Sequence, residues 1–298
     1  MVNKGELSAM SQPFFSICMP AYQGAAFIKK AIASVRAQTF SDWELIIVDD
    51  ASTDGTWEIL EDEASRDPRI RIFRNDSNLG MAENWDETLR HVRGEWIGTL
   101  AEDDIYMPDA LEHVYQGARD PNVALWVHAH YSVHEDGRKD LVRPFASPQR
   151  FAMSELALLF YKRGCIFGEI SCHFLSVKAV RQTEQGVGES RPTADLDFYM
   201  RVALANPAAQ ALYSPKILTE TLIHEASDSA RYIKSGQNWV DIFAFVGKFS
   251  DQPWKFSVRV RQALRLIYCL LRYGNKLSPN QKTLICQSTL KVISHIIN

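Results

Sequence analysis

The sequence lacks several features that mark common classes of protein. Its five cysteines are an odd number without a CxxC pair, which predicts neither a disulfide framework nor a zinc site and suits a reducing cytoplasm. No run of about 18 uncharged apolar residues occurs, so we expect no membrane span, and the polar residues 1–12 predict no signal peptide. The pattern GxGxxG is also absent, which argues against a nucleotide-dependent dehydrogenase.

Acidic residues are missing from one end of the chain. None follows Asp251, whereas the last 47 residues contain eight lysines and arginines. Because the whole chain carries a formal charge of −3, this tail carries +8 and the rest −11. The acidic body predicts no binding of nucleic acid, and the asymmetry is typical of a tail that binds a surface.

The composition and the pattern of apolar residues indicate an α/β protein with a real core. Hydrophobic residues make up 46% of the chain and charged residues 23%. Apolar runs predict strands over residues 14–19, 43–48, 70–73, 95–100 and 124–130, the first ended by Pro20. Helical patterns lie over residues 25–38, 56–64, 81–92, 108–115, 154–161 and 196–204, while residues 136–148 read as a loop. This alternation predicts a mainly parallel, doubly wound sheet flanked by helices.

The chain becomes purely helical near its end, which predicts a boundary between Glu225 and Gln237. We therefore divide it into an N-terminal tail (1–13), a catalytic domain (14–230) and a basic helical C-terminal extension (231–298). In the extension, Arg261, Arg265 and Arg272 fall on one face of an amphipathic helix over residues 255–273. Such a helix can lie on an anionic membrane or pack on the domain or a second subunit.

Acidic and aromatic residues follow the predicted strands where ligands bind in open α/β sheets. Pro20-Ala21-Tyr22 ends the first strand, Asp49-Asp50 the second and Glu102-Asp103-Asp104 a later one, and Asp195-Leu196-Asp197 opens a helix. Packed carboxylates repel one another, and a divalent cation such as Mg²⁺ or Mn²⁺ relieves this while keeping positions open for phosphates.

Each of these residues also has a structural interpretation. Asp50 and Asp104 are common turn and cap formers, Tyr22 could stack on a base or cover the sheet end, and Asp195 could be a general base or a helix cap. His224 could bind metal or phosphate, although a lone histidine is more often structural.

Taken in order, the motifs resemble those of inverting glycosyltransferases of family 2, which have the GT-A fold. The resemblance covers residues 14–225 and is carried by these segments: SICMPAY (16–22), SVRAQTF (34–40), IVDDASTDGT (47–56), NLG with Asn84, GEWI (94–97), EDDIYMPDAL (102–111) and ADLDFYMR (194–201). Three positions depart from the family pattern: Glu102 replaces an aspartate, Ala194 stands where many relatives have glutamate, and residues 81–83 lack an arginine.

The resemblance implies a role for each motif residue. Pro20, Ala21, Tyr22, Asp50, Asn84 and Asp103 are expected at the nucleotide, Asp50 on the base and Asp103 near the ribose. Asp104 is expected to bind Mn²⁺ or Mg²⁺, with His224 and Glu102 as further candidates. Asp195 is the expected general base, and Arg201 is expected to orient the acidic segment around it.

The resemblance also implies an activity. A sugar would pass with inversion from a nucleotide-diphosphate donor, a UDP-sugar by expectation, to a glycan or lipid-linked glycan, at the inner face of the cell membrane. Residues 146–191 should shape the acceptor site, although Phe167 and His173 there could equally pack the core. The alternative is a non-catalytic nucleotide-sugar-binding or scaffolding protein of the same fold.

Overall fold

A computed structural model describes residues 12–164, 166–183, 186–187, 193–225, 227, 237–273 and 278–297. Its strands are β1 Phe15–Ala21, β2 Trp43–Asp49, β3 Ile70–Arg74, β4 Trp96–Thr99, β5 Ile105–Tyr106, β6 Val123–His134, β7 Lys139–Val142, β8 Gln149–Ala152, β9 His173–Ser176 and β10 Gln210–Ile223. Its helices are α1 Ile28–Arg36, α2 Thr56–Arg66, α3 Met81–Arg90, α4 Ala110–Ala118, α5 Met153–Arg163, η1 Ile170–Cys172, α6 Val177–Val180, α7 Ala194–Ala205, α9 Gln237–Lys248, α10 Phe256–Tyr273 and α11 Pro279–Ile297.

All ten strands form one mixed sheet in the order β3-β2-β1-β4-β9-β6-β10-β5, with β7 paired to β6 and β8 to β10. The first four strands of this order run parallel, and every residue of β2 is buried, as expected for a strand covered on both faces. β9 is antiparallel to both β4 and β6 and joins this half to the β6–β10 half. The predicted α/β class is confirmed.

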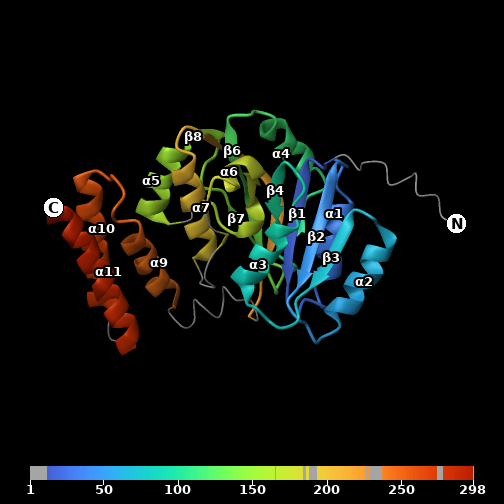
Figure 1. Ribbon diagram of the computed structural model, residues 1–298, viewed down its shortest axis with the longest axis horizontal. Coiled ribbons are helices and arrows are strands. Elements are labelled where there is room, and N and C mark those ends of the chain that lie inside the picture. The colour runs from blue at the N-terminus through green and yellow to red at the C-terminus, as the bar shows by residue number, and fades with distance from the viewer. Residues whose placement is uncertain are drawn as a thin grey trace.

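Helices cover both faces of the sheet (Figure 1). Side chains of α1, α2 and α4 pack with Phe15, Ile17 and Met19 on one face. On the other face, α3, α5 and α7 share a larger core with β6 and with the C-terminal helices. Because helices fill both faces, a ligand can reach the sheet only at the ends of its strands.

The first strand does not stop at Pro20, as the sequence had suggested. β1 continues to Ala21, and Pro20 lies opposite Val48 of β2. On its other side β1 pairs with β4 only from Phe15 to Cys18. The missing N–H of Pro20 therefore costs no ladder hydrogen bond, since β4 has already ended at that level.

The second half of the sheet differs most from the sequence prediction. The expected loop over residues 136–148 contains β7, which forms a hairpin with β6, and β8 follows at residue 149. The longest strand, β10, was not predicted at all. Its pairing with β6 is shifted between Ser214 and Ile217, around Pro215, and this irregularity breaks the alternation that would have indicated a strand.

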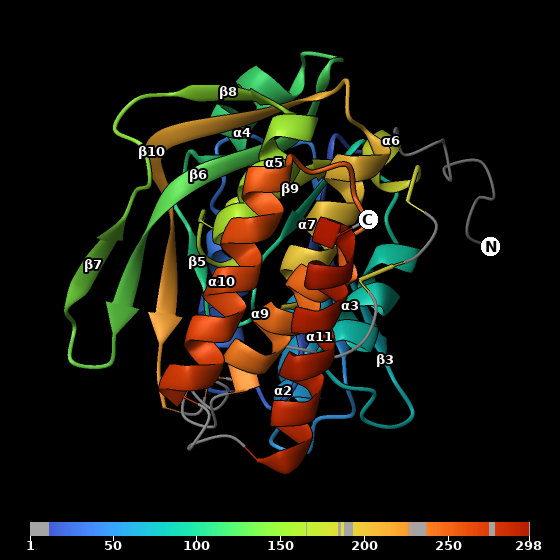
Figure 2. The same ribbon diagram turned by 90° about the vertical axis from the view of Figure 1, so that its left-hand side faces the viewer.

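The C-terminal helices pack against the α/β part of the chain, on the side of α5 and α7 (Figures 1 and 2). Gln262 and Arg265 of α10 donate hydrogen bonds to the carbonyls of Tyr161 and Lys162 at the end of α5. Lys248 of α9 forms an ion pair with Asp197 of α7 (2.5 Å). The expected helical extension is thus present, whereas most of the proposed boundary falls on residues 228–236, outside the described part. Among the described helices, none combines the length and apolar character needed to span a bilayer.

Candidate active site

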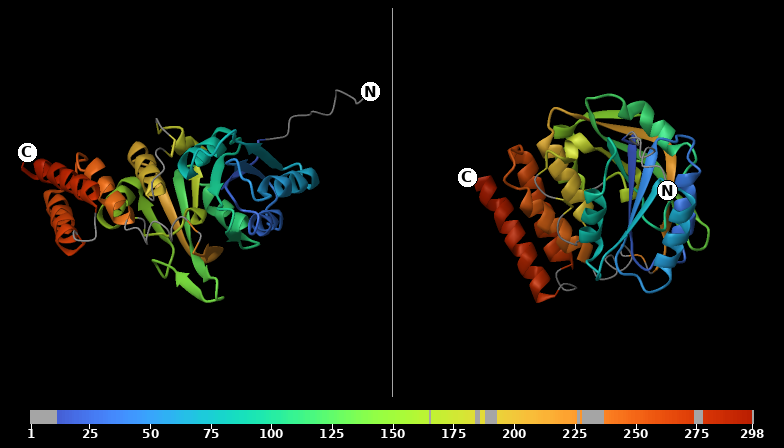
Figure 3. Two further views of the ribbon diagram at one scale, coloured as in Figure 1. Left: turned by 90° about the horizontal axis from the view of Figure 1, so that it is seen from below. Right: turned by 45° about the vertical axis from the view of Figure 1, so that its right-hand side comes forward.

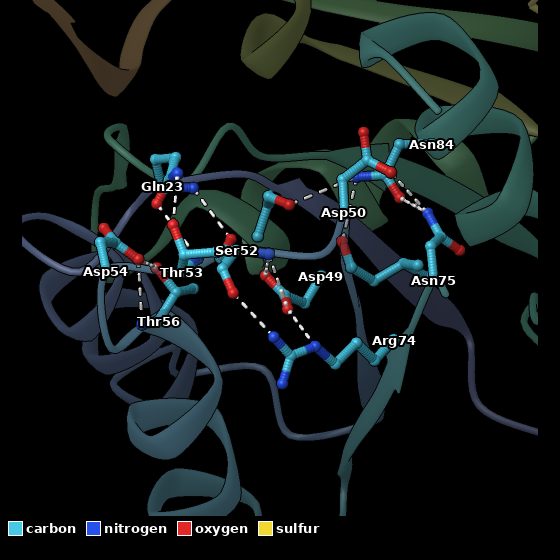
Figure 4. A network of polar contacts seen from close by, with 12 residues as sticks. Gln23, Asp49, Asp50, Ser52, Thr53, Asp54, Thr56, Arg74, Asn75 and Asn84 are labelled. Carbon is cyan, nitrogen blue, oxygen red and sulfur yellow. Dashed lines mark hydrogen bonds and ion pairs between the residues drawn. The ribbon is translucent and has the colours of Figure 1, made fainter. Parts of the chain in front are cut away.

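The ends of β1 and β2 lie side by side and carry a hydrogen-bonded turn (Figure 4). Asp49 is fully buried, pairs with Arg74 (3.1 Å) and accepts hydrogen bonds from the Ser52 N–H. Asp54 accepts hydrogen bonds from the N–H (3.1 Å) and the hydroxyl of Thr56, the first residue of α2. These contacts fix the turn from which Asp50 projects.

Asp50 is buried and fastens the segment before α3. Its carboxylate accepts hydrogen bonds from the Asn75 side chain (2.8 Å) and from the N–H groups of Leu79 (2.8 Å) and Gly80 (2.9 Å). A carboxylate has about four acceptor positions, so one remains for a ligand. The main role of the Asp50 side chain is therefore structural, and its carboxylate has one acceptor position left for a ring N–H.

Two residues expected at the nucleotide are buried. Asn84 is 2% exposed, and its side chain donates to the Val48 carbonyl (3.0 Å) and accepts from Asn75 (3.0 Å). Ala21 is buried, and its carbonyl accepts the Asp50 N–H (2.8 Å). Both residues hold strand ends together, so the structure argues against direct contact of either side chain with a nucleotide.

Tyr22 and Glu102 lie at the open edge of the site. Tyr22 is 47% exposed, and its N–H donates to Glu102 Oε1 (3.3 Å). The Glu102 side chain also lies so close to Gly24 that a Cβ there would come within 2.8 Å of its Cγ. Glu102 thus packs on the loop after β1, and Tyr22 offers an exposed ring for stacking.

Asp103 and His224 form a close pair at the end of the sheet. His224 Nε2 lies 3.0 Å from Asp103 Oδ2, and the two side chains are 11% and 20% exposed. The ring of Phe27, which precedes α1, packs against the imidazole with the centroids 5.0 Å apart. The pair joins two chain segments 121 residues apart, so a carboxylate and an imidazole meet where β10 ends.

Asp104 points into the protein rather than into the site. It is 4% exposed, its Oδ2 accepts from the Ser171 hydroxyl (2.5 Å) and its Oδ1 from the Leu222 N–H (2.9 Å). Burial, with the nearby Asp103, raises the pKa of Asp104 well above its usual value. Because Asp104 is buried and each of its oxygens accepts a hydrogen bond from the protein, this geometry gives it a structural role.

Asp195 is the second residue of α7 and remains partly exposed. Its Oδ1 accepts the Leu196 N–H (2.7 Å). Desolvation of the carboxyl, together with the charge of Glu169, raises the pKa of Asp195 to about 7. A carboxyl that titrates near neutral pH can both accept and release a proton there, as a general base must. Arg201 pairs with Asp197 (2.8 Å), in keeping with its expected role of orienting the acidic segment.

Glu169 links the two groups of carboxylates electrostatically. Its charge raises the pKa of both Asp104 and Asp195, and desolvation and Asp103 raise the pKa of Glu169 itself. The backbone at Glu169 is held in place, because the Glu169 carbonyl accepts the Cys172 N–H (3.0 Å) and contacts His173 Nδ1 (3.0 Å). Glu169 therefore lies close enough to Asp103 and to Asp195 for the charges to influence one another.

Residues 16–181 match the family model described as glycosyl transferase family 2. The chain belongs to glycosyl transferase family 2. Curated relatives include chondroitin synthase of Escherichia coli, 29% identical over 199 residues that cover 65% of this chain and 27% of that protein. Another is the E. coli UDP-Glc:alpha-D-GlcNAc-diphosphoundecaprenol beta-1,3-glucosyltransferase WfgD, 30% identical over 148 residues that cover 49% of this chain and 56% of that protein. The chain thus spans less than two thirds of the length of these relatives.

Solved structures of similar fold show that this family 2 member has the GT-A fold. TarS of Staphylococcus aureus (residues 1–349, with UDP-GlcNAc) gives a TM-score of 0.73 at 15% identity, covering 95% of this chain and 81% of that one. The Pyrobaculum calidifontis mannosyltransferase PcManGT, with GDP-Man and Mn²⁺, gives 0.62 at 16% identity, covering 97% and 88%. The predicted family and fold are both confirmed.

The donor atoms of this family 2 site fit a divalent cation in part. Oxygen and imidazole nitrogen are ligands that Mn²⁺ accepts, and the Asp103–His224 pair offers one of each. Among the described residues, no group of three or more histidine, cysteine or acidic side chains is arranged to hold a metal ion. Two protein ligands would leave most positions of an octahedral ion for water and substrate phosphates, the coordination usual for Mg²⁺ in phosphate sites.

Sequence reasoning missed the residues that position this site. Ser171 holds Asp104, Phe27 packs on His224, and Asn75 bridges Asp50 and Asn84. None lies beside another polar motif residue in the sequence, so no local signal marked them. Phe167 and His173, by contrast, are 1% and 2% exposed, which confirms the packing alternative for both.

Proposed function

We propose that the chain is an inverting, metal-assisted glycosyltransferase that uses a nucleoside diphosphate sugar. The proposal is carried by the family 2 match together with the Asp103–His224 pair at the end of the sheet, and it is supported by Asp195 at the start of α7, whose pKa is raised by desolvation and by the charge of Glu169. This combination offers a base on one side and ligands for a charged leaving group on the other. A UDP-sugar is the expected donor, since a solved structure of similar fold holds UDP-GlcNAc and the name of WfgD specifies UDP-Glc.

The nucleotide would lie over the ends of β1 and β2. The exposed Tyr22 ring is available to stack on the base, and the remaining acceptor position of Asp50 suits a ring N–H. Pro20, partly buried beside Tyr22, would form the floor of this pocket. Glu102 keeps the Tyr22 backbone in place and is not needed as a ligand.

The diphosphate would lie at Asp103 and His224. We assign the metal contact to Asp103 and His224 instead of Asp104, because only the former pair lies at the accessible end of the sheet with its polar atoms directed at each other. A bound divalent cation would supply positive charge that stabilises the departing diphosphate. Asp104 would keep the Asp103 backbone in place through Ser171 and Leu222.

Asp195 would take the proton of the acceptor hydroxyl. As that oxygen forms a bond to the anomeric carbon, the bond from this carbon to the diphosphate breaks, and the proton remains on the Asp195 carboxyl. Attack from the face opposite the leaving group inverts the anomeric configuration. Glu169 would keep Asp195 basic enough to accept the proton near pH 7.

The acceptor is proposed to be a saccharide or a lipid-linked saccharide. The name of WfgD specifies an acceptor joined to diphosphoundecaprenol, and that of TuaG of Bacillus subtilis, 36% identical over 101 residues, specifies teichuronic acid biosynthesis. We propose that the enzyme works in the cytoplasm at the inner face of the cell membrane. The buried Cys18 forms no disulfide, which is compatible with a reducing compartment.

A panel of sugar donors tests this proposal. UDP-glucose, UDP-galactose, UDP-GlcNAc and GDP-mannose would each be incubated with Mn²⁺ and a diphosphate-linked GlcNAc lipid, and nucleoside diphosphate release and product anomeric configuration would be measured. We expect release from one donor class and an inverted linkage. Release from none, together with tight binding of a donor, would favour the non-catalytic alternative.

A further inference from the structure

The C-terminal helix α10 presents two apolar faces, and only one of them is covered by the protein. Val258, Ala263 and Leu266 are at most 6% exposed and belong to the main core. On the opposite face, Phe256, Leu264, Ile267 and Tyr268 are 65%, 61%, 37% and 61% exposed. Figure 2 shows α10 at the surface, with α9 behind it and α11 beside it.

These exposed side chains follow one stripe of the helix. Phe256, Leu264 and Ile267, with the half-buried Val260 between the first two, are spaced by helical turns, so they lie along a single face, and Tyr268 borders it. Contiguous exposed apolar residues of this kind mark an interaction site more often than scattered ones do. We call this set, together with Tyr268, the α10 outer face.

Every charged residue in the sequence of α10 is basic. Arg261 is exposed and lies three residues before Leu264 and seven before Tyr268, on the same side of the helix. Lys255 is exposed just before the helix begins. Of the other two arginines expected beside the stripe, Arg265 turns toward the Lys162 carbonyl, and the side chain of Arg272 lies outside the described part. No acidic residue follows Asp251 in the sequence.

We propose that the α10 outer face docks on an anionic lipid surface, with Leu264, Ile267 and Tyr268 in the headgroup boundary and Arg261 against lipid phosphates. A basic helix with an apolar stripe lies in the plane of such a surface, about 5–10 Å deep. The docking would bring the proposed active site to a lipid-linked acceptor. The delivery of the site to a lipid-linked acceptor rests on the proposed function. The docking itself does not, because the exposed face is observed whatever reaction the protein catalyses.

A second copy of the chain fits the same face less well. A stable dimer buries about 800 Å² on each partner, whereas four partly exposed side chains offer on the order of 500 Å². Two copies meeting across this face would also bring their Arg261 side chains together without any acid from residues 252–298 to pair them. An anionic lipid surface offers apolar contact to the exposed stripe and negative charge to the basic side chains.

Co-sedimentation of the full chain with phosphatidylcholine vesicles, with and without phosphatidylglycerol, tests the docking. We expect binding to the anionic vesicles, reduced at least tenfold in the double variant L264S/Y268S. Arg261→Glu changes two charges, each worth about fivefold at an anionic surface, so it should weaken binding about 30-fold on anionic vesicles alone. Leu290→Ser is the matched control, since Leu290 is 65% exposed among polar residues of α11 and should not affect binding.

Three results would overturn the docking: no sedimentation of the wild type, equal sedimentation of L264S/Y268S, or a dimer in light scattering that L264S/Y268S dissociates. UDP titration of each variant without vesicles separates this test from the proposed function. If UDP binding is absent while vesicle binding persists, the proposed function fails and the docking stands.

Discussion

The proposed base makes activity depend on pH near neutrality. With the pKa of Asp195 at about 7, about one tenth of this carboxyl is ionised at pH 6, about half at pH 7 and about nine tenths at pH 8. We therefore expect kcat/KM to rise about tenfold from pH 6 to pH 8. An aspartate at the ordinary value of 3.8 would be almost fully ionised throughout and would give no rise.

Two variants separate the cause of this pH dependence from other titrations. Asp195→Asn should lower kcat by about 10²–10⁴, the usual contribution of a general base. Glu169→Gln should move the rise to lower pH, because it removes a negative charge that raises the pKa of Asp195. Both are measured by initial rates of nucleoside diphosphate release across the pH range. A flat profile in the wild type, or an unshifted one in Glu169→Gln, would refute the reasoning.

The free energy of unfolding of Asp195→Asn shows whether this variant loses activity because the base is missing or because the protein is misfolded. Between pH about 4 and about 7 the native Asp195 keeps a proton that the unfolded chain has lost, so its stabilising contribution falls as pH rises through this window. Asp195→Asn should thus be more stable than the wild type at pH 8, by at most about 4 kcal/mol, and nearly equal to it at pH 4. Urea unfolding at both pH values measures this difference.

Three further substitutions test the roles given to neighbouring residues. Tyr22→Ala should weaken UDP binding by about 1–3 kcal/mol through lost stacking, measured by calorimetry, and unchanged affinity would leave its ring without a function. Ser171→Ala should cost about 1–3 kcal/mol of unfolding free energy in urea, because Asp104 loses a buried donor. Asn84→Ala should cost a similar amount without weakening UDP binding of the folded protein, and the reverse outcome would return Asn84 to the pocket.

The parallel half of the fold could be predicted from the sequence, whereas the other half could not. β2 is a continuous apolar run because helices cover both of its faces, and such runs are visible in one dimension. β10 is long but irregular around Pro215, and β5 and β9 are short strands whose pairing partners lie far away in the chain. Their formation depends on neighbours in the sheet, which periodicity alone does not identify.

In the candidate site, the sequence located the acidic motif but did not predict in which direction each side chain points. Three consecutive acids after β4 predicted a cluster of charge, but which of them faces outward depends on the turn and on partners from β10 and the Ser171 loop. Asp103 contacts His224 and Asp104 turns inward, and for this reason we propose Asp103, instead of the expected Asp104, as the metal contact. The carboxylate of Asp50 holds three loop donors, in keeping with its structural interpretation, and its contact with a base stays a prediction.

The central claim is that Asp103 and His224 bind a nucleoside diphosphate through a divalent cation. Calorimetric titration of UDP and GDP, each with and without Mn²⁺, would be carried out on the wild type, Asp103→Asn and the charge-matched control Asp62→Asn, which alters an exposed acid on α2. We predict Mn²⁺-dependent binding of one diphosphate to the wild type and the control, and its loss in Asp103→Asn. Equal binding with and without Mn²⁺, or full binding by Asp103→Asn, would contradict the account.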